Sequence, residues 1–206
     1  MKRYFNIYKL TILFAFITAF TFACNADKKA ASEETVNAVT VNNKETAGES
    51  LYQLEGEWHS QNGDTLQLAE LNGKIPVVSM IFTRCGFACP RIVADIKNIE
   101  KQIPAEKKDS VVFVLVSFDS ERDNPDKLKE FATEMKLDDK WILLHGGEQE
   151  VRELSMLLNV KYKKQPDGSF AHSNGITLLD ANGAIAAHVE GLGTDPEPIV
   201  SKMKEL

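Results

Sequence analysis

The sequence predicts an α/β domain in which a central mixed sheet is flanked by helices and preceded by an extra β-hairpin. Three short runs are almost wholly apolar, as expected of strands buried on both faces: residues 77–82, 111–118 and 141–144. Each run is followed by a segment with helical spacing of apolar residues, which predicts parallel β-α-β units. Near the end of the chain, residues 176–179 and 185–189 flank the turn Asp180-Ala181-Asn182-Gly183, which predicts an antiparallel hairpin.

The first part of the domain starts with a predicted hairpin over residues 58–68, where Asn62-Gly63-Asp64 marks the turn. The helix after the first buried strand is predicted from apolar residues at helical spacing, Ile92, Ile96, Ile99 and Ile103. After the second buried strand, Asn124-Pro125 is typical of a helix N-terminus, and the inner face of that helix comprises Leu128, Phe131, Ala132 and Met135.

The remaining helices follow the same logic. The helix after residues 141–144 has an apolar face of Val151, Leu154, Leu157 and Leu158. Asp195-Pro196 starts the last helix, whose inner face comprises Ile199, Val200 and Met203.

This order of elements resembles the thioredoxin fold. In that fold the loop before the penultimate strand, here residues 170–173, faces the loop that follows the first buried strand.

Two cysteines, Cys85 and Cys89, lie where the first buried strand gives way to its helix. Pro90 suits the first helical position, so we expect Cys89 at the helix cap and Cys85 in the loop before it. Unpaired backbone N–H groups and the positive end of the helix dipole favour thiolate over thiol at this place. The spacing alone leaves three uses open: a redox-active pair that forms a disulfide, two ligands of one metal ion, or a plain stabilising disulfide.

The N-terminal 50 residues are predicted to lie outside this domain, which comprises residues 51–206. Residues 1–23 read as an export signal, with Lys2, Arg3 and Lys9 before an uncharged apolar segment. The signal ends in Thr21-Phe22-Ala23-Cys24, which resembles the lipobox of bacterial lipoproteins and predicts lipidation of Cys24. Residues 24–50 then form a flexible tether. We therefore expect a membrane-anchored lipoprotein that faces the periplasm.

The charge of the mature chain bears on its partners. Removal of residues 1–23 takes away three basic and no acidic residues, which leaves 21 basic and 30 acidic residues and a net charge of −9. A chain this acidic is not expected to bind nucleic acid.

Three segments together resemble the Sco/SenC family of thioredoxin-like copper proteins over about residues 50–205. They are residues 83–90, which contain both cysteines; the charged turn of residues 117–125; and His172-Ser173 before a strand and Asp180. The resemblance implies that Cys85, Cys89 and His172 bind copper. It also implies a partner that receives the metal, a respiratory oxidase subunit with the dinuclear copper centre of cytochrome c oxidase or another copper enzyme. Some members of the family act instead as thiol–disulfide reductants.

The donor set favours the same metal. Two thiolates and an imidazole suit copper in both oxidation states, although three ligands with an open position also suit zinc. Copper delivery is therefore our leading hypothesis. The alternatives are a thiol–disulfide reductase that prepares cysteines in a copper-receiving partner, with Cys85 and Cys89 as its redox pair, and a peroxidase or redox sensor.

The sequence contains further polar residues whose roles bear on the site. Asp119, Arg122 and Asp123 form a charged turn after a buried strand. They serve either loop hydrogen bonding alone, or support of the ligands and docking of a partner. The other histidines, His59, His145 and His188, are interpreted as structural or surface residues.

Overall fold

A computed structural model describes residues 50–206 of the chain. The predicted export signal, the lipidation site Cys24 and the tether up to residue 49 lie outside the described residues. Within residues 50–206, no helix is both long and apolar enough to span a bilayer.

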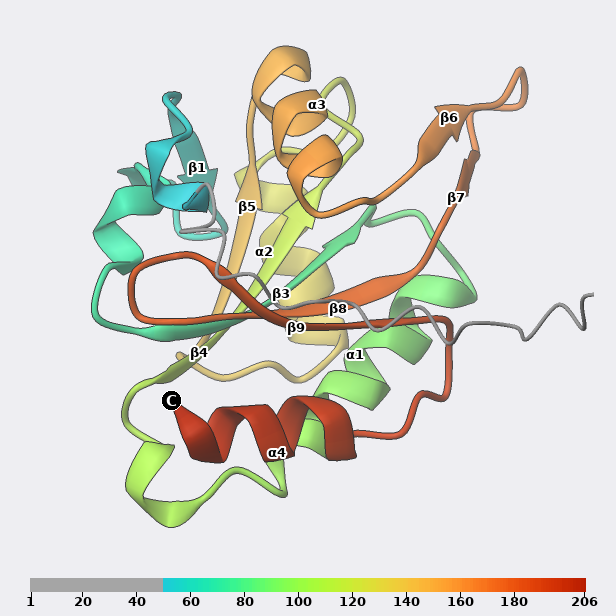
Figure 1. The fold of residues 1–206 in the computed structure, drawn as a ribbon. Coiled ribbons are helices and arrows are strands. Elements are labelled where there is room, and N and C mark those ends of the chain that lie inside the picture. The colour runs from blue at the N-terminus through green and yellow to red at the C-terminus, as the bar shows by residue number, and fades with distance from the viewer. Residues whose placement is uncertain (1–49) are drawn as a thin grey trace, which may run out of the picture. The chain divides into compact units, whose positions relative to one another are not determined.

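The centre of the fold is a seven-stranded mixed sheet in the order β2-β1-β5-β4-β3-β8-β9 (Figure 1). Three parallel strands lie in the middle: β3 (Ile75–Ile81), β4 (Val111–Ser117) and β5 (Trp141–His145). Every residue of β3 is buried, in agreement with the run of β-branched residues that predicted it. The three predicted buried strands are confirmed.

Antiparallel strands complete the sheet on both sides. β8 (Gly175–Leu179) pairs with β3 and with β9 (Ile185–Glu190), which confirms the C-terminal hairpin. β1 (Trp58–Ser60) pairs with β2 (Thr65–Leu66) and β5, which confirms the extra N-terminal hairpin. Three short 3-10 helices, Leu51–Gln53, Leu68–Leu71 and Ala105–Lys107, complete the connections.

The helices cover both faces of this sheet. In Figure 1, α3 (Glu148–Leu157) lies above the strands, while α1 (Ala88–Glu100) and α4 (Glu197–Glu205) lie below them. α2 (Pro125–Glu134) packs against β5 and β1. Asn124 caps α2 as predicted, because its side chain accepts a hydrogen bond from the Lys127 N–H over 3.0 Å.

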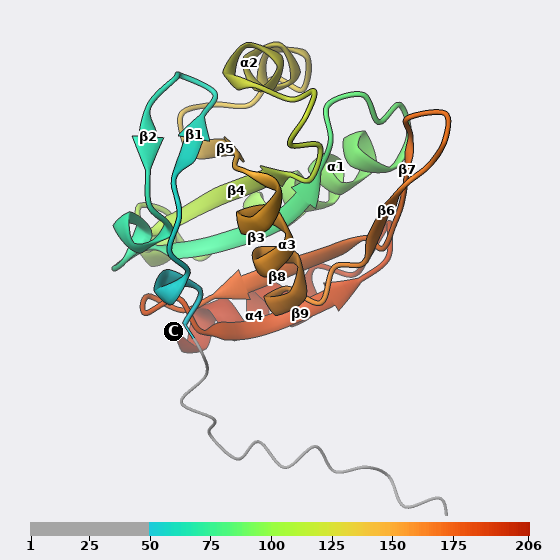
Figure 2. The ribbon, with the colours of Figure 1, turned by 90° about the horizontal axis from the view of Figure 1, so that it is seen from above.

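A second, two-stranded sheet was not predicted. β6 (Tyr162–Lys164) and β7 (Phe170–His172) form an antiparallel hairpin that pairs with no strand of the main sheet. Figure 2 shows this hairpin beyond the end of the main sheet, beside the start of α1. The predicted loop of residues 170–173 is therefore mostly a strand, and it brings His172 toward the cysteines.

Candidate metal centre

The cysteine loop connects β3 to α1. Helix α1 begins at Ala88 with Phe87 at its N-cap, so the prediction that Cys89 caps the helix was wrong. Cys89 is the second helical residue and Pro90 the third. All three of these positions lie in the first turn, where backbone N–H groups have no partner within the helix, so a proline fits at the third position as well as at the first.

The two thiols have different surroundings. Cys89 is completely buried, whereas Cys85 is half-buried in the loop before the helix, and both are free cysteines. The Cys89 N–H donates a hydrogen bond to the Cys85 sulfur over 3.3 Å. Because Phe87 offers no capping side chain, the Cys85 sulfur takes the place of a helix-capping acceptor.

These surroundings move the two thiol pKa values in opposite directions. Burial raises the pKa of Cys85, but hydrogen bonds from the backbone N–H groups of Cys89, Phe87 and Ala88 outweigh it, so the net pKa is lowered. Burial raises the pKa of Cys89 strongly, and the neighbouring Cys85 and Asp123 raise it further. The predicted thiolate is therefore confined to Cys85, and Cys89 is stabilised as a neutral thiol.

His172 reaches the cysteines from the end of β7. Its Nδ1 lies 3.0 Å from the Ser173 carbonyl oxygen. Because a carbonyl only accepts, the tautomer of the neutral ring that fits this contact carries its proton on Nδ1 and has its lone pair on Nε2. The imidazole lies edge-on to Phe82 with ring centroids 5.9 Å apart, and its centroid lies 5.1 Å from that of Phe118. A backbone acceptor and two aromatic rings thus orient the ring of His172.

The ligand atoms of Cys85, Cys89 and His172 all lie within 4.8 Å of one another. No further Cys, His, Asp or Glu of residues 50–206 joins this group. Two sulfurs and one imidazole nitrogen form a soft donor set that suits copper and is unsuited to Mg²⁺ or Ca²⁺. The half-buried Cys85 and His172 leave one side of the group open to solvent.

The charged turn of residues 119–123 contacts the start of the cysteine loop at Thr83. Asp119 and Asp123 are 1% and 2% exposed, so the turn is not simply a solvated loop. Asp123 accepts hydrogen bonds from the Thr83 N–H over 2.9 Å, from the Thr83 hydroxyl over 2.5 Å and from the Ser117 hydroxyl over 2.6 Å. Asp119 pairs with Arg122 over 2.6 Å. These residues form no hydrogen bond with the three ligand side chains; they hold the segments that carry them.

The other histidines do not join the metal group. His59 and His145 face each other across β1 and β5, with ring centroids 5.3 Å apart. His188 shares a 2.8 Å hydrogen bond with the Thr177 hydroxyl on the neighbouring strand β8. These contacts agree with the interpretation of all three as structural residues.

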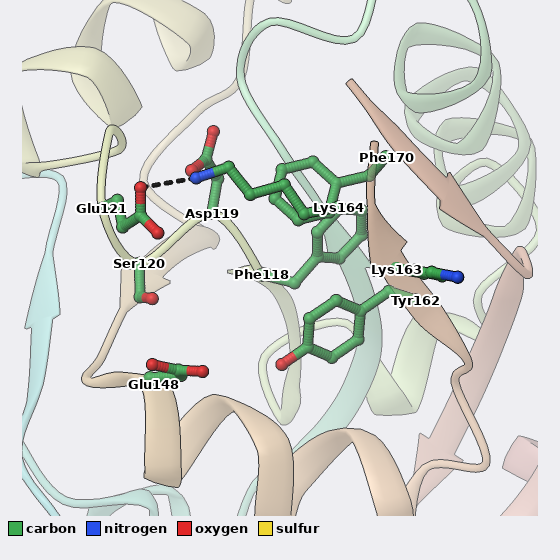
Figure 3. Close-up of a pocket in the computed structure, with 9 residues that line it drawn as sticks. All are labelled: Phe118, Asp119, Ser120, Glu121, Glu148, Tyr162, Lys163, Lys164 and Phe170. Atoms are coloured by element: carbon green, nitrogen blue, oxygen red, sulfur yellow. Dashed lines mark hydrogen bonds and ion pairs between the residues drawn. The ribbon is translucent and has the colours of Figure 1, made fainter. Parts of the chain in front are cut away.

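A pocket of about 190 Å³ lies between the charged turn and the β6–β7 hairpin (Figure 3). Phe118 forms part of its floor, and Phe118 contacts His172 on one side and stacks on Tyr162 with ring centroids 5.3 Å apart. The charged turn forms one wall and the β6–β7 hairpin the opposite wall. None of the three candidate ligands lines this pocket, so it is separate from the metal group. Its full lining is Phe118, Asp119, Ser120, Glu121, Glu148, Tyr162, Lys163, Lys164 and Phe170.

Comparison with known proteins identifies the family. The SCO1/SenC family model matches residues 45–206, which is most of the chain. The chain belongs to the SCO1/SenC family. A SCO1 protein homolog of Bacillus subtilis is 30% identical over 152 residues, which cover 71% of this chain and 78% of that protein. The resemblance inferred from the cysteine loop, the charged turn and His172 is thereby confirmed.

Solved structures of Sco proteins share the fold. A SCO1/SenC family lipoprotein of Bacillus anthracis is 29% identical, with a TM-score of 0.67 over 76% of this chain and 95% of that one. BsSco, described as a member of the Sco family of cytochrome c oxidase assembly proteins, is 28% identical, with a TM-score of 0.63 over 77% and 95%. A copper-bound Sco protein of Arabidopsis thaliana is 22% identical, with a TM-score of 0.65 over 77% and 99%. The predicted thioredoxin-like fold is therefore confirmed.

Proposed function

We propose that this protein binds copper through Cys85, Cys89 and His172 and delivers it to the copper site of a respiratory oxidase subunit or a similar copper enzyme. The observation that carries the proposal is the convergence of two thiols and one imidazole within 4.8 Å at a partly exposed edge of the fold. Membership of the SCO1/SenC family supports it, since BsSco is described as belonging to a family of cytochrome c oxidase assembly proteins.

Three ligands suit a carrier because copper held this way keeps an open coordination position. A ligand of the receiving protein can bind the ion from the exposed side before the bond between copper and the buried Cys89 breaks. The lowered pKa of Cys85 favours its thiolate form, and copper displaces the proton of Cys89 as it binds.

We also propose that the protein lies outside the cytoplasm and is anchored to a membrane by a lipid on Cys24. The lipobox-like segment before Cys24 supports this placement, and so does the likeness to a lipoprotein of the same family in Bacillus anthracis. A membrane-anchored carrier in the periplasm would lie near the oxidase subunits that receive copper there.

A second function, reduction of a disulfide in the copper-receiving partner, is favoured by the asymmetry of the two thiols. A half-exposed cysteine with a lowered pKa suits nucleophilic attack, and a buried neutral cysteine four residues later suits resolution of the mixed disulfide. In that reaction Cys85 and Cys89 lose two electrons and two protons to form a disulfide, and the partner's disulfide becomes two thiols.

His172 separates the two functions because disulfide exchange needs only the cysteines. We expect His172→Ala to retain reduction of a partner disulfide within about tenfold of wild type. Copper affinity should fall by at least the 10–100-fold typical of changes that only surround a metal site, and thiolate-to-copper charge-transfer absorption should disappear. His188→Ala, which alters a histidine outside the metal group, is the matched control.

The deciding measurement is copper-dependent oxidase activity in cells that carry only the variant. Loss of oxidase activity with disulfide reduction intact supports copper delivery. Full rescue by a His172→Ala protein that no longer binds copper would overturn delivery in favour of the reductase.

A further inference from the structure

The hairpin that carries His172 pairs with no strand of the main sheet, although Phe82 and Phe118, which follow β3 and β4, pack against its aromatic side chains. β6 and β7 pair only with each other, and an isolated two-stranded hairpin is at best marginally stable in water. Its base is closed by the Ser173 N–H, which donates to the Lys161 carbonyl over 2.8 Å. Contacts from outside the hairpin must therefore fix its place against the cysteine loop.

Arg122 makes one of these contacts, in addition to the packing of Phe82 and Phe118 on the hairpin. Its Nε donates to the buried Asp119 carboxylate over 2.6 Å, and another guanidinium nitrogen donates to the Gly168 carbonyl at the tip of the hairpin. The guanidinium carbon also lies 5.6 Å from the centroid of the Phe170 ring, two residues before His172. The planar fork of one arginine thus joins the charged turn to both the tip and the second strand of the hairpin.

The contact with Arg122 requires a glycine at position 168. Its φ is +80°, and a Cβ at this position would lie 2.7 Å from a nitrogen of the Arg122 guanidinium. A side chain here would be strained in its backbone and would displace the arginine. The close approach of backbone and guanidinium therefore depends on glycine.

The same turn also holds the cysteine loop. Asp123, the residue after Arg122, accepts two hydrogen bonds from Thr83, which precedes Cys85 by two residues. The turn from Asp119 to Asp123 therefore contacts two segments. Asp123 bonds the start of the cysteine loop, and Arg122 bonds the hairpin that carries His172.

We infer that Arg122 is a positioning residue. By bonding both the charged turn and the β6–β7 hairpin, it sets the distance of His172 from the two thiols. The inference rests on the proposed use of Cys85, Cys89 and His172 as copper ligands. Arg122 forms no hydrogen bond or ion pair with those ligands, so its effect on copper passes through the position of the hairpin.

A second link between turn and hairpin provides a matched control. Lys164 on β6 pairs with Glu121 over 2.5 Å across the mouth of the pocket in Figure 3. Both side chains are largely exposed, at 42% and 69%, and exposed ion pairs contribute little to stability. Lys164→Ala should therefore leave the hairpin in place, although it removes a cation that connects the same two segments.

The test variant is Arg122→Lys. Lysine keeps a positive charge beside the buried Asp119, so the fold is retained, but its single nitrogen cannot reproduce the two separate bonds of the fork. Arg122→Ala serves as the stronger variant and is compared only if its thermal unfolding matches that of Arg122→Lys.

The first readout needs no metal. In the metal-free protein, amide hydrogen exchange of residues 161–173 should be at least about tenfold faster in Arg122→Lys, the effect expected for loss of a hydrogen bond from a charged group. Exchange in β3 and β4 should not change, and Lys164→Ala should behave as wild type. Wild-type exchange of the hairpin in both Arg122 variants would overturn the inference.

The second readout is Cu(I) affinity, measured by competition with a chromophoric chelator. Arg122→Lys should lose roughly 10–100-fold in affinity. Combined with His172→Ala it should cause no further loss, because without the imidazole the position of the hairpin no longer matters. An equal loss in both backgrounds would overturn the inference. A His172→Ala protein with wild-type copper affinity would instead overturn the proposed metal site itself.

Discussion

The backbone N–H of Cys89 donates to the sulfur of Cys85 over 3.3 Å, so the buried member of the pair stabilises the negative charge of the half-exposed member. The pair is unequal in consequence. The pKa of Cys85 is lowered by backbone hydrogen bonds that outweigh its partial burial, and the pKa of Cys89 is raised mainly by its burial.

This inequality predicts the order of alkylation in the metal-free, reduced protein. Cys85 should react first, and its rate against pH should reach a plateau below the pH at which a cysteine in the unfolded chain does so, because the thiolate is the nucleophile. Cys89 should react slowly at every pH that leaves the fold intact. Mass spectrometry of iodoacetamide-treated protein over a pH series measures both rates. Equal rates that follow an ordinary thiol titration would contradict the electrostatic account.

Asp123 provides a test of the charged turn that concerns stability. Asp123→Ala should lower the free energy of unfolding by about 2–4 kcal/mol, because buried hydrogen-bond donors on Thr83 and Ser117 lose their acceptor. Urea denaturation measures the change. Asp139→Ala, at an exposed position, should change the stability by less than about 0.5 kcal/mol. Equal stability of the two variants would mean that the contacts of Asp123 contribute nothing.

The main strands and helices were predictable because their signals are local. The apolar runs of residues 77–82 and 111–118 predicted the buried strands β3 and β4, which span residues 75–81 and 111–117. Asn124 caps α2, as its position before a proline indicated. The start of α1 was predicted two residues too far along the chain, because the first helical turn tolerates proline at several positions. In the structure the helix begins at Ala88, so Pro90 is its third residue and not its first.

The β6–β7 hairpin could have been found in part. Pro166-Asp167-Gly168 is a turn signal, and Tyr162 and Phe170 flank it at hairpin spacing. The lysines and glutamine around that turn hide any alternation of apolar and polar residues. The contacts that hold the hairpin come from distant segments: Phe82 and Phe118 pack on its aromatic side chains, and Arg122, more than forty residues earlier in the chain, bonds Gly168. Neither that contact nor the burial of Asp119 and Asp123 can be read from local sequence, which indicates an exposed charged loop.

A prediction on location concerns Cys24. If Cys24 is lipidated, Cys24→Ser should move the protein from the membrane fraction to the soluble periplasmic fraction. Its melting temperature should not fall, because the sequence predicts that Cys24 and the tether lie outside the folded domain. Fractionation followed by immunoblotting measures this. Continued membrane association of the variant would show that something other than Cys24 anchors the chain.

The last prediction concerns how a copper-receiving partner docks. Phe87 lies between the two cysteines and is 80% exposed, the most exposed of the large apolar side chains in residues 50–206. A single exposed aromatic residue is unremarkable on most surfaces. Phe87 differs in that its backbone N–H bonds the sulfur of Cys85, one of the proposed copper ligands. Aromatic side chains are frequent anchors at the centre of interfaces.

Phe87→Ser should therefore leave stability and Cu(I) affinity unchanged, since the side chain contributes neither to the core nor to the ligands. It should slow copper transfer to the soluble copper domain of the oxidase from the same organism by roughly 10–30-fold, as expected for loss of an interface anchor. Ile185→Ser is the matched control, because Ile185 is 46% exposed and pairs with Leu179 at the end of the sheet away from the cysteines. Stopped-flow transfer rates compare the two variants. If both variants transfer copper at the wild-type rate, the partner does not dock over Phe87, and if both are slowed equally, the loss reflects surface polarity in general rather than this position.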